Sequence, residues 1–592
     1  MLGLDFSMIK EEKLSYYINR SKLLKLGKKD KKIKIGILSS FTINGLEETL
    51  RVKCDNANID AETFVSGYNQ IHQEILNTNS KLYSFSPEIT FLILDIRSFL
   101  GDMFYFTYDL KIEERKEFVK NQFLDISNLI STFSKNLNSK LVVCNFNIPN
   151  FSPYGIFETK VDYGLKEMIL DLNSQLIEFI KKYDSVYMYD FNGFVNQFGE
   201  NNVFNYREFF FGDVKISIHF IPFLAHDFMG YIKATLGLTR KCIVLDLDNT
   251  VWGGVVGEDG LEGIKLGENG IGKAFYEFQK LLLSFHKRGI ILAVNSKNNL
   301  NDAIQVINAH PHMLLREENF ANLHINWNDK VSNMIEIAQE LNIGLDSIVY
   351  FDDDPINREF VKQNLPTVMT IDLPEDPTEF SKTLMQINDF NLLKITDDDV
   401  LRGKMYQDEK QRKNLQNTSS NLDDFLRQLN IKIKILKPDK YTIPRISQLT
   451  LKTNQFNLTT KRYQEEQIKE FSENDRFLVG CAKVEDKFGD NGITGVFIIF
   501  KESKKTWIID TFLLSCRVMG RKIEDAILGH ILQIAKNSGV TKVIGKFLPT
   551  NKNIPSENFL KEYGFKKEGD EWIFNPQESV EIPSHLELKT NE

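Results

Sequence analysis

Short apolar runs that end in polar residues alternate with helical patterns through much of this chain. Within residues 31–238, strand-like runs at 34–38, 89–94, 141–144 and 186–189 are separated by amphipathic helical patterns at 115–136 and 161–182. Apolar runs without polar alternation are typical of strands that helices cover on both faces. This alternation predicts a parallel, doubly wound sheet.

The same pattern returns between residues 239 and 377, where each strand-like run ends in side chains capable of chemistry. The run 242–245 precedes Asp246, Asp248 and Thr250, the run 290–294 precedes Asn295, Ser296 and Lys297, and the run 348–351 precedes Asp352, Asp353 and Asp354. Lys330 opens a helical pattern. Ligands of open α/β sheets bind at the carboxyl ends of the strands, so we expect these residues to share one site. The alternative for the first segment is a strand that ends in a polar turn, and a lone Ser, a helix-start Lys and an acidic turn are each common on protein surfaces.

Carboxylates, a hydroxyl and an ammonium group are the components that phosphoryl transfer uses. An attacking carboxylate and a phosphoryl oxygen repel each other, so we expect a divalent cation between them, and Mg²⁺ prefers hard oxygen ligands. Asp246 and Asp352 are the expected metal ligands, with Asp353 and the carbonyl oxygen of Asp248 as further candidates. Ser296 and Lys330 would neutralise the remaining phosphoryl charge.

Together these segments resemble the four motifs of the haloacid dehalogenase superfamily, which appear here as Asp246/Asp248/Thr250, Ser296, Lys330 and Asp352/Asp353. The resemblance implies that Asp246 forms an aspartyl-phosphate. It implies that Asp248 protonates the leaving oxygen and later activates water. We expect Asn249, Asn295 and Lys297 to contact the substrate, whereas Asp354 adds charge without an assigned role.

The domain at 31–238 resembles the SGNH-hydrolase fold, with Ser39 or Ser40 at the nucleophile position and Gly67 near the second conserved block. It departs from that pattern because the usual Gly-Asp-Ser is absent and Asp95 stands where an amide residue is expected. There is no clear Asp-x-x-His pair, and His219 and His226 are candidates by location only. We interpret this domain as non-hydrolytic and expect it to bind a substrate or a partner.

A further globular unit is predicted at 432–575, after a helical linker at 378–431 whose first helix is expected to begin at Asp397-Asp398-Asp399. Strand-like runs at 477–485, 492–500 and 506–514 precede a loop at 515–522 and a helix at 523–537. An Arg-x-x-Gly turn at a helix N-terminus offers free N–H groups to a pyrophosphate. The unit resembles the GNAT acyltransferase fold, which implies that Arg517, Gly520 and Arg521 hold a pantetheine arm. Lys522 departs from the small residue usual at its position.

The chain as a whole, from about residue 33 to 570, is similar to the FkbH-like family, placed in subfamily IIIC of the haloacid dehalogenase superfamily. The resemblance rests on the extended motif at 246–260, the segment at 449–459 and the segment Ser-Cys-Arg-Val-Met-Gly-Arg at 515–521. It implies that the chain dephosphorylates a three-carbon acyl phosphate related to 1,3-bisphosphoglycerate. The glyceryl unit would then be loaded on an acyl carrier protein, in natural-product or surface-polysaccharide biosynthesis.

Cys516 is the cysteine best placed to hold the acyl group as a thioester, since it lies at a strand end beside Arg517. The alternative is a small buried residue without chemistry. A plain small-molecule phosphatase with inert flanking domains, and a non-catalytic scaffold that binds a carrier protein, are the competing functions.

Composition narrows the class of protein further. The net charge is −8 with no evident basic face, which argues against a nucleic-acid partner. The five cysteines have no paired spacing, and neither a signal peptide nor a run of eighteen apolar residues is present. We therefore expect a cytoplasmic protein without a membrane partner. Its expected parts are an N-terminal segment at 1–30, domains at 31–238, 239–377 and 432–575, the linker between them, and a polar tail at 576–592.

Overall fold

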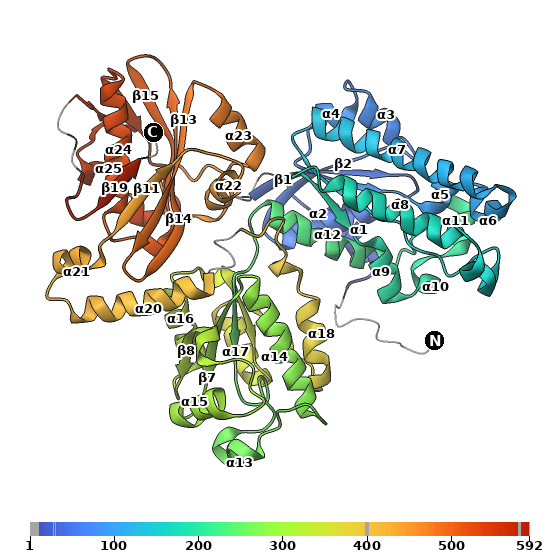
Figure 1. The fold of residues 1–592 in the computed structure, drawn as a ribbon, viewed down its shortest axis with the longest axis horizontal. Helices are drawn as coiled ribbons and strands as arrows, with labels where there is room; N and C mark the ends of the chain where they lie inside the picture. Colours follow the sequence, from blue (N-terminus) through green and yellow to red (C-terminus); the bar gives the residue numbers. More distant parts are fainter. Residues whose placement is uncertain are drawn as a thin grey trace. The chain divides into compact units, whose positions relative to one another are not determined.

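In a computed structural model, which describes residues 11–25, 27, 29, 31–396, 402–577, 580 and 582–590, the chain forms two compact units. Unit 1 comprises Met1–Leu236 and unit 2 comprises Gly237–Glu592 (Figure 1). Unit 2 contains two sheets, so the predicted boundary near residue 238 separates two units, whereas the predicted later domains belong to one unit. The expected helix start at Asp397-Asp398-Asp399 lies outside the described residues.

Unit 1 has a five-stranded parallel sheet of order β2-β1-β3-β4-β5. Its strands are β1 (Lys31–Ser39), β2 (Ile59–Val65), β3 (Ile89–Ile93), β4 (Lys140–Cys144) and β5 (Val186–Tyr189). Its helices are α1 (Leu14–Ser21), α2 (Leu46–Asn56), α3 (Ile71–Leu76), α4 (Lys81–Phe85), α5 (Ile96–Leu100), α6 (Met103–Phe106), α7 (Ile112–Asn136), α8 (Leu165–Ile180), α9 (Phe191–Phe198), α10 (Glu200–Val203), α11 (Tyr206–Gly212) and α12 (Ile221–Thr235). The doubly wound sheet predicted from the alternation is confirmed.

Helices cover both faces of this sheet, with α2 and α12 on one face and α7 and α8 on the other (Figure 1). Right-handed crossovers require this division, because β2 and β3 lie on opposite sides of β1. The point where the strand order reverses, between β1 and β3, is where open sheets of this kind bind ligands. β2 was not predicted from the sequence, because its second half, Glu62 to Val65, is only partly buried and its apolar pattern is weak.

The first sheet of unit 2 is also parallel, with the order β10-β9-β6-β7-β8. Its strands are β6 (Cys242–Leu245), β7 (Ile291–Ser296), β8 (Phe320–Ile325), β9 (Ile348–Phe351) and β10 (Met369–Thr370). Its helices are α13 (Val256–Gly263), α14 (Gly272–Lys287), α15 (Leu300–Ala309), α16 (Lys330–Glu340), α17 (Pro355–Asn364) and α18 (Phe380–Met385). β6 and β9 are buried throughout, as their uninterrupted apolar runs predict.

The second sheet of unit 2 is mixed and nine-stranded, of order β17-β18-β16-β15-β14-β13-β11-β19, with β12 paired to β15. Its strands are β11 (Lys432–Leu436), β12 (Phe456–Asn457), β13 (Phe477–Asp486), β14 (Gly489–Lys501), β15 (Thr506–Leu514), β16 (Lys542–Gly545), β17 (Lys566–Glu568), β18 (Glu571–Phe574) and β19 (Glu587–Thr590). The accompanying helices are α20 (Arg402–Thr418), α21 (Leu422–Leu429), α22 (Ile443–Lys452), α23 (Glu465–Glu473), α24 (Ile523–Asn537) and α25 (Phe559–Tyr563).

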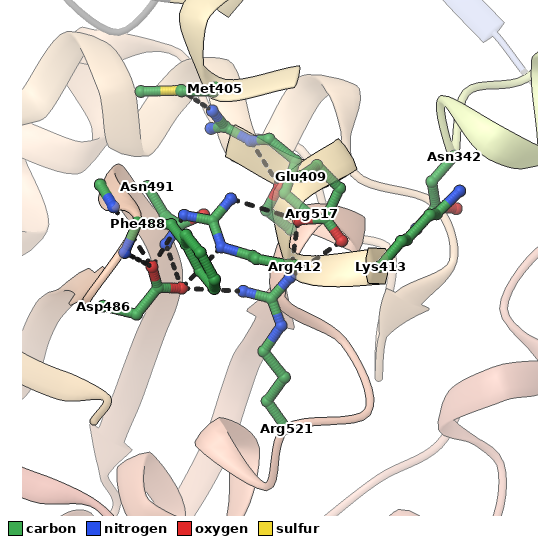
Figure 2. A network of polar contacts seen from close by, with 12 residues as sticks. Asn342, Met405, Glu409, Arg412, Lys413, Asp486, Phe488, Asn491, Arg517 and Arg521 are labelled. Carbon is green, nitrogen blue, oxygen red and sulfur yellow. Dashed lines mark hydrogen bonds and ion pairs between the residues drawn. The ribbon is translucent and has the colours of Figure 1, made fainter. Parts of the chain in front are cut away.

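At the edges of this sheet the structure shows contacts that the predicted tail and linker do not include. The expected polar tail at 576–592 contains β19, which pairs in parallel with β11, and Leu586 beside it is buried. The expected linker does not stand apart from the sheet, because the Arg412 guanidinium of α20 donates two hydrogen bonds to Asp486 of β13, at 2.7 and 2.9 Å (Figure 2). Among the described residues, none of the helices combines the length and hydrophobicity that crossing a bilayer requires.

Candidate functional site

The candidate site lies at the carboxyl edge of the first sheet of unit 2, where the strand order reverses between β6 and β9. Asp246 follows β6 directly, and its backbone N–H donates to the Phe351 carbonyl oxygen at 2.8 Å. Asp352 follows β9, and Ser296 is the last residue of β7. The parallel register therefore brings the ends of three strands together, as the apolar runs predict.

Lys330 lies at the centre of these groups. It is the first residue of α16, and Asp329 caps the helix by accepting from the N–H groups of Val331 and Ser332. The Lys330 side chain is 1% exposed, and its Nζ lies 2.6 Å from Asp246 Oδ1 and 3.2 Å from Asp352 Oδ2. Burial alone would lower the pKa of Lys330, but the two carboxylates raise it overall, so the side chain remains an ammonium ion.

Three carboxylates crowd around this ammonium group. Oxygen atoms of Asp246, Asp352 and Asp353 all lie within 4.8 Å of one another. Burial, together with the charges of Asp246 and Asp352, raises the pKa of Asp353 to about 6. One lysine does not neutralise three acids, so the cluster has unbalanced negative charge, and its oxygen donors are those that a hard divalent cation prefers. The residues present therefore fit Mg²⁺.

Neighbouring groups hold the carboxylates in place. Thr250 is fully buried, and its Oγ1 accepts from the Asp353 N–H at 3.1 Å and donates to Asp353 Oδ1 at 3.3 Å. Tyr350 donates its hydroxyl hydrogen to Asp352. Arg358 donates to the carbonyl oxygens of Asp352 and Asp353 at 2.8 and 2.6 Å. Thr250 thus acts on the acidic segment after β9.

Asp248 lies outside this carboxylate cluster. Its Oδ1 accepts from the Trp252 indole N–H at 2.9 Å and from the Val256 N–H at 3.1 Å, and its Oδ2 accepts from the Asn298 amide at 2.8 Å. Three donors fix the orientation of this carboxylate. Asn298 and Trp252 support Asp248, and the sequence analysis gave neither a role, although Trp252 lies in the extended motif at 246–260 and Asn298 lies two residues after Ser296.

Of the three expected substrate contacts, two have their side chains committed to the fold. Asn295 is fully buried, donates to the Lys330 carbonyl oxygen at 2.9 Å and accepts from the Asn333 amide at 3.1 Å. Asn249 has φ of 52°, and its side chain accepts from the Gly254 N–H, which closes the turn after β6. Lys297 is exposed at the sheet edge. Asn295 is a positioning residue rather than a substrate contact.

Asp354 caps α17, because its side chain accepts from the Ile356 N–H at 2.9 Å and Pro355 follows it. Asp354, the third acid after β9 and the one without an assigned role, is therefore a structural residue.

The C-terminal loop differs from what its resemblance implies. The Cys516 thiol is buried, which raises its pKa, and it donates to the Asn342 carbonyl oxygen at 3.0 Å. In return, the Asn342 amide donates to the Cys516 carbonyl oxygen at 2.7 Å. A thiol with a raised pKa is a poor nucleophile, which favours a structural role, and the assignment of Cys516 as an acyl carrier stays a prediction.

The arginines of this loop are also engaged within the protein. Arg521 is 5% exposed and lies 2.8 Å from Glu409 and 3.5 Å from Asp486 (Figure 2). Arg517 points toward Met405 of α20 in the same network (Figure 2). Gly520 has φ of +76° in the turn between them. The guanidinium groups of the two arginines contact residues of α20 and β13. They are therefore not available to bind a pantetheine phosphate.

The start of α24 is equally unsuited to a pyrophosphate. Lys522 precedes the helix with φ of 62°, and Glu524 and Asp525 occupy its first turn. Burial raises the pKa of Glu524 to about 7, and its Oε2 is buried without a hydrogen-bond partner among the described residues. Two acids in the first turn compete with a bound anion for the positive end of the helix. In addition, β12 occupies the edge of β15 at Leu513 and Leu514, where an extended arm could have paired.

The hydrolase candidates of unit 1 do not form a catalytic arrangement. Ser39 Oγ donates to the Phe41 carbonyl oxygen at 2.8 Å, and Ser40 Oγ accepts from the Asp95 N–H at 3.0 Å. His219 is exposed, and His226 lies 3.4 Å from Glu11. No hydrogen bond joins either serine to a histidine among the described residues, and the non-hydrolytic interpretation stays a prediction. Gly67 follows β2, and Cβ at that position would meet the Gln70 side chain.

Comparison with known proteins supports parts of this picture. Residues 34–233 match the family model of the FkbH N-terminal domain. The chain is similar to the crystal structure of the N-terminal part of the protein BF1531 from Bacteroides fragilis, described as containing a phosphatase domain complexed with Mg. Sequence identity is 28% and the TM-score is 0.60, and the match covers 65% of this chain and 100% of that chain. None of the curated proteins matches the sequence.

The remaining similarities concern acetyltransferases. The IAA acetyltransferase from Bacillus cereus ATCC 14579 has 21% identity and a TM-score of 0.17, over 23% of this chain and 77% of that chain. A GNAT family acetyltransferase from Elizabethkingia anophelis with acetyl-CoA bound has 16% identity and a TM-score of 0.17, over 23% of this chain and 76% of that chain. These scores are too low to assign a fold, so the GNAT-like fold stays a prediction.

Proposed function

We propose that the chain is a Mg²⁺-dependent phosphatase of the haloacid dehalogenase type that acts on a small phosphorylated metabolite. The observation that carries this proposal is the buried Lys330 ammonium group between Asp246 and Asp352, with Asp353 beside them. The chain is 28% identical in sequence to a protein described as containing a phosphatase domain complexed with Mg, and this similarity supports the proposal.

Each residue of the cluster has a role in this reaction. Asp246, Asp352 and Asp353 would hold Mg²⁺, which supplies positive charge where the nucleophile meets the phosphoryl oxygens. An Asp246 oxygen attacks phosphorus, and the bond to the leaving oxygen breaks as Asp248 transfers a proton to that oxygen. Asp248 then removes a proton from water, which hydrolyses the aspartyl-phosphate and returns Asp246 and inorganic phosphate. Lys330 and the Ser296 hydroxyl neutralise phosphoryl charge during both steps.

The finer proposal concerns the substrate and the acceptor. The substrate is a three-carbon acyl phosphate that also carries a phosphate ester, which the Asp246 site hydrolyses. The thiolate of an acyl carrier protein then attacks the acyl carbonyl carbon and expels the second phosphate, so the glyceryl unit becomes a thioester of the carrier. Because the Cys516 thiol is buried, we propose that transfer is direct and needs no thioester on this chain.

The test measures phosphate release and carrier loading by the full-length protein with Mg²⁺. Asp246→Asn is nearly isosteric and should lower phosphate release by at least about 10³-fold, because the nucleophile is lost. Asp354→Asn is the matched control, since asparagine also caps a helix, and it should retain activity. Equal phosphate release by wild type and Asp246→Asn would refute the proposed chemistry.

Cys516→Ser separates direct transfer from transfer through the enzyme. It should load a holo carrier protein, followed by mass spectrometry, at the wild-type rate. Loss of loading with intact phosphate release would show that Cys516 does carry the acyl group. If neither protein loads the carrier while phosphate is still released, the chain is a plain phosphatase, which the engaged Arg517 and Arg521 side chains also favour.

A further inference from the structure

Unit 1 contains a pocket of about 400 Å³, including the space open to solvent, that the phosphatase chemistry does not use. It lies beside the end of β3, close to the reversal of strand order between β1 and β3, where open sheets bind ligands. Four of the lining residues are aromatic, and six carry a charge or an amide group. The lining residues are Asp95, Ile96, Arg97, Phe104, Asn147, Pro149, Glu200, Phe204, Asn205, Tyr206, Phe209 and Lys215.

Asn147 is the first sign that this pocket takes a ligand. Its side chain lines the pocket although the residue is only 5% exposed. Among the described residues, no hydrogen bond satisfies its amide group. The neighbouring Asn145 and Asn173, in contrast, both bond within the protein. The Asn147 amide reaches the space of the pocket, where it can hydrogen-bond a ligand or an ordered water.

Arg97 supplies a positive charge at the same pocket. Its guanidinium group stacks on Phe104, Tyr206 and Phe209, with 4.7, 5.0 and 5.6 Å to the ring centroids. It donates one hydrogen bond, at 2.9 Å, to the Tyr206 hydroxyl. Within the described part of the chain, no carboxylate forms an ion pair with it. The aromatic rings thus hold a planar fork of N–H donors whose remaining hydrogens can bind a carboxylate.

The second cation of the pocket is already neutralised. Lys215 is buried, and its ammonium group contacts Asp95 and donates to Ser98 Oγ at 2.7 Å. Glu200 adds a negative charge, with one oxygen accepting from the Asn150 N–H at 2.8 Å. A doubly charged phosphate would meet this carboxylate, whereas a ligand with one carboxylate and a nearby N–H or O–H donor satisfies Arg97 and Glu200 together.

We propose that this pocket binds a small organic acid with one carboxylate, a hydroxyl or amino group on the adjacent carbon, and an apolar side chain. The carboxylate bonds Arg97 and the Asn147 amide, the donor faces Glu200, and the apolar part packs on Phe104, Phe204 and Phe209. Neither Ser39 nor Ser40 is among the residues that line the pocket, so the proposed role is binding of the acid rather than its hydrolysis. This inference is independent of the phosphatase proposal.

Calorimetric titration of the full-length protein tests the proposal with five probes: lactate, alanine, phenyllactate, phenylalanine and phenylalaninamide. Phenyllactate or phenylalanine should bind at least tenfold more tightly than lactate or alanine, because of the aromatic walls. Their relative affinity distinguishes a hydroxy acid from an amino acid. Phenylalaninamide, which lacks the carboxylate, should not bind. Failure of all four acids to bind at millimolar concentration, or equal binding of the amide, would overturn the proposal.

Two variants locate the binding. Arg97→Gln should weaken the better acid at least tenfold, and Arg207→Gln, at an exposed arginine of α11 outside the pocket, should leave it unchanged. Asn147→Leu, of similar volume, tests the amide separately and should weaken binding as well. Circular dichroism checks that each variant is folded. Wild-type affinity in both folded pocket variants would place the binding elsewhere and contradict the assignment.

Discussion

At the scale of single residues, charge balance decides what the candidate site can do. Lys330 lies between Asp246 and Asp352, and burial, together with the charges of these two acids, raises the pKa of Asp353. A cation at this cluster, or a phosphoryl group held by Lys330, would change that balance. The same reasoning separates Lys330 from Lys297, which lies at the same sheet edge but is exposed.

Lys330→Met should lower turnover by roughly 10²–10³-fold, the loss typical when one preorganised electrostatic group is removed from an active site. Lys287→Met, at an exposed lysine of α14 outside the site, is the control and should change turnover by less than about threefold, since an exposed charge is screened by solvent. Steady-state phosphate release with Mg²⁺ measures both. Comparable losses in the two variants would mean that burial between the carboxylates confers no special role on Lys330.

Glu524 gives a prediction about stability and pH. Its pKa is raised by burial from 4.5 to about 7, so the folded state binds the proton more tightly than the unfolded state. The contribution of Glu524 to the stability of the folded state is therefore most favourable below pH 4.5 and is lost as the pH rises through 7. Glu524→Gln mimics the protonated form. It should stabilise the protein by on the order of 2 kcal/mol at pH 8 and change little at pH 4.5.

Denaturant unfolding of wild type and variant at the two pH values checks this difference. Glu557→Gln, at an exposed position in the same domain, is the control and should have no effect at either pH. An equal effect of Glu524→Gln at pH 4.5 and pH 8 would show that the carboxyl does not titrate in this range.

At the scale of elements, the sequence predicted best where strands are fully buried. β6 and β9 have the predicted bounds because nothing polar interrupts their runs, and α16 begins at Lys330 as expected. Prediction from the sequence failed where strand pairing depends on distant segments, as for β2, β12 and β19, which are short or partly exposed. The candidate site was predictable because parallel strands bring their ends together. The hydrogen bonds and contacts that engage Asn295, Cys516, Arg517 and Arg521 within the protein were not predictable, because their partners come from other elements.

β19 provides a test at this scale. Truncation after Gln577 would remove the strand that pairs with β11, together with the buried Leu586. Unfolding of the C-terminal domain should become easier by about 2 kcal/mol, the contribution of burying one leucine side chain. The freed edge of β11 should also promote association at high concentration. Truncation after Thr590 is the control. Unchanged unfolding after the longer truncation would show that β19 adds nothing to the sheet.

At the scale of the whole molecule, the two units divide the proposed chemistry between them. Unit 1 has its own parallel sheet, its own core and the pocket beside Arg97 and Asn147. Unit 2 contains every residue of the phosphatase site, and the C-terminal loop is joined to the loop after α16 through Asn342 and Cys516. A division of this kind predicts that each function survives without the other unit.

We expect residues 11–236 and residues 237–592, produced separately, to fold on their own, because each encloses complete sheets and a separate core. The second fragment should release phosphate with Mg²⁺ within about threefold of the full-length rate, since Asp246, Lys330 and Asp352 all lie in it. The first should bind the preferred acid with the full-length affinity. Cooperative thermal unfolding establishes that each fragment is folded. A folded second fragment without phosphatase activity would mean that unit 1 contributes to the reaction, and the pocket would then have to be reconsidered as part of the same catalytic cycle.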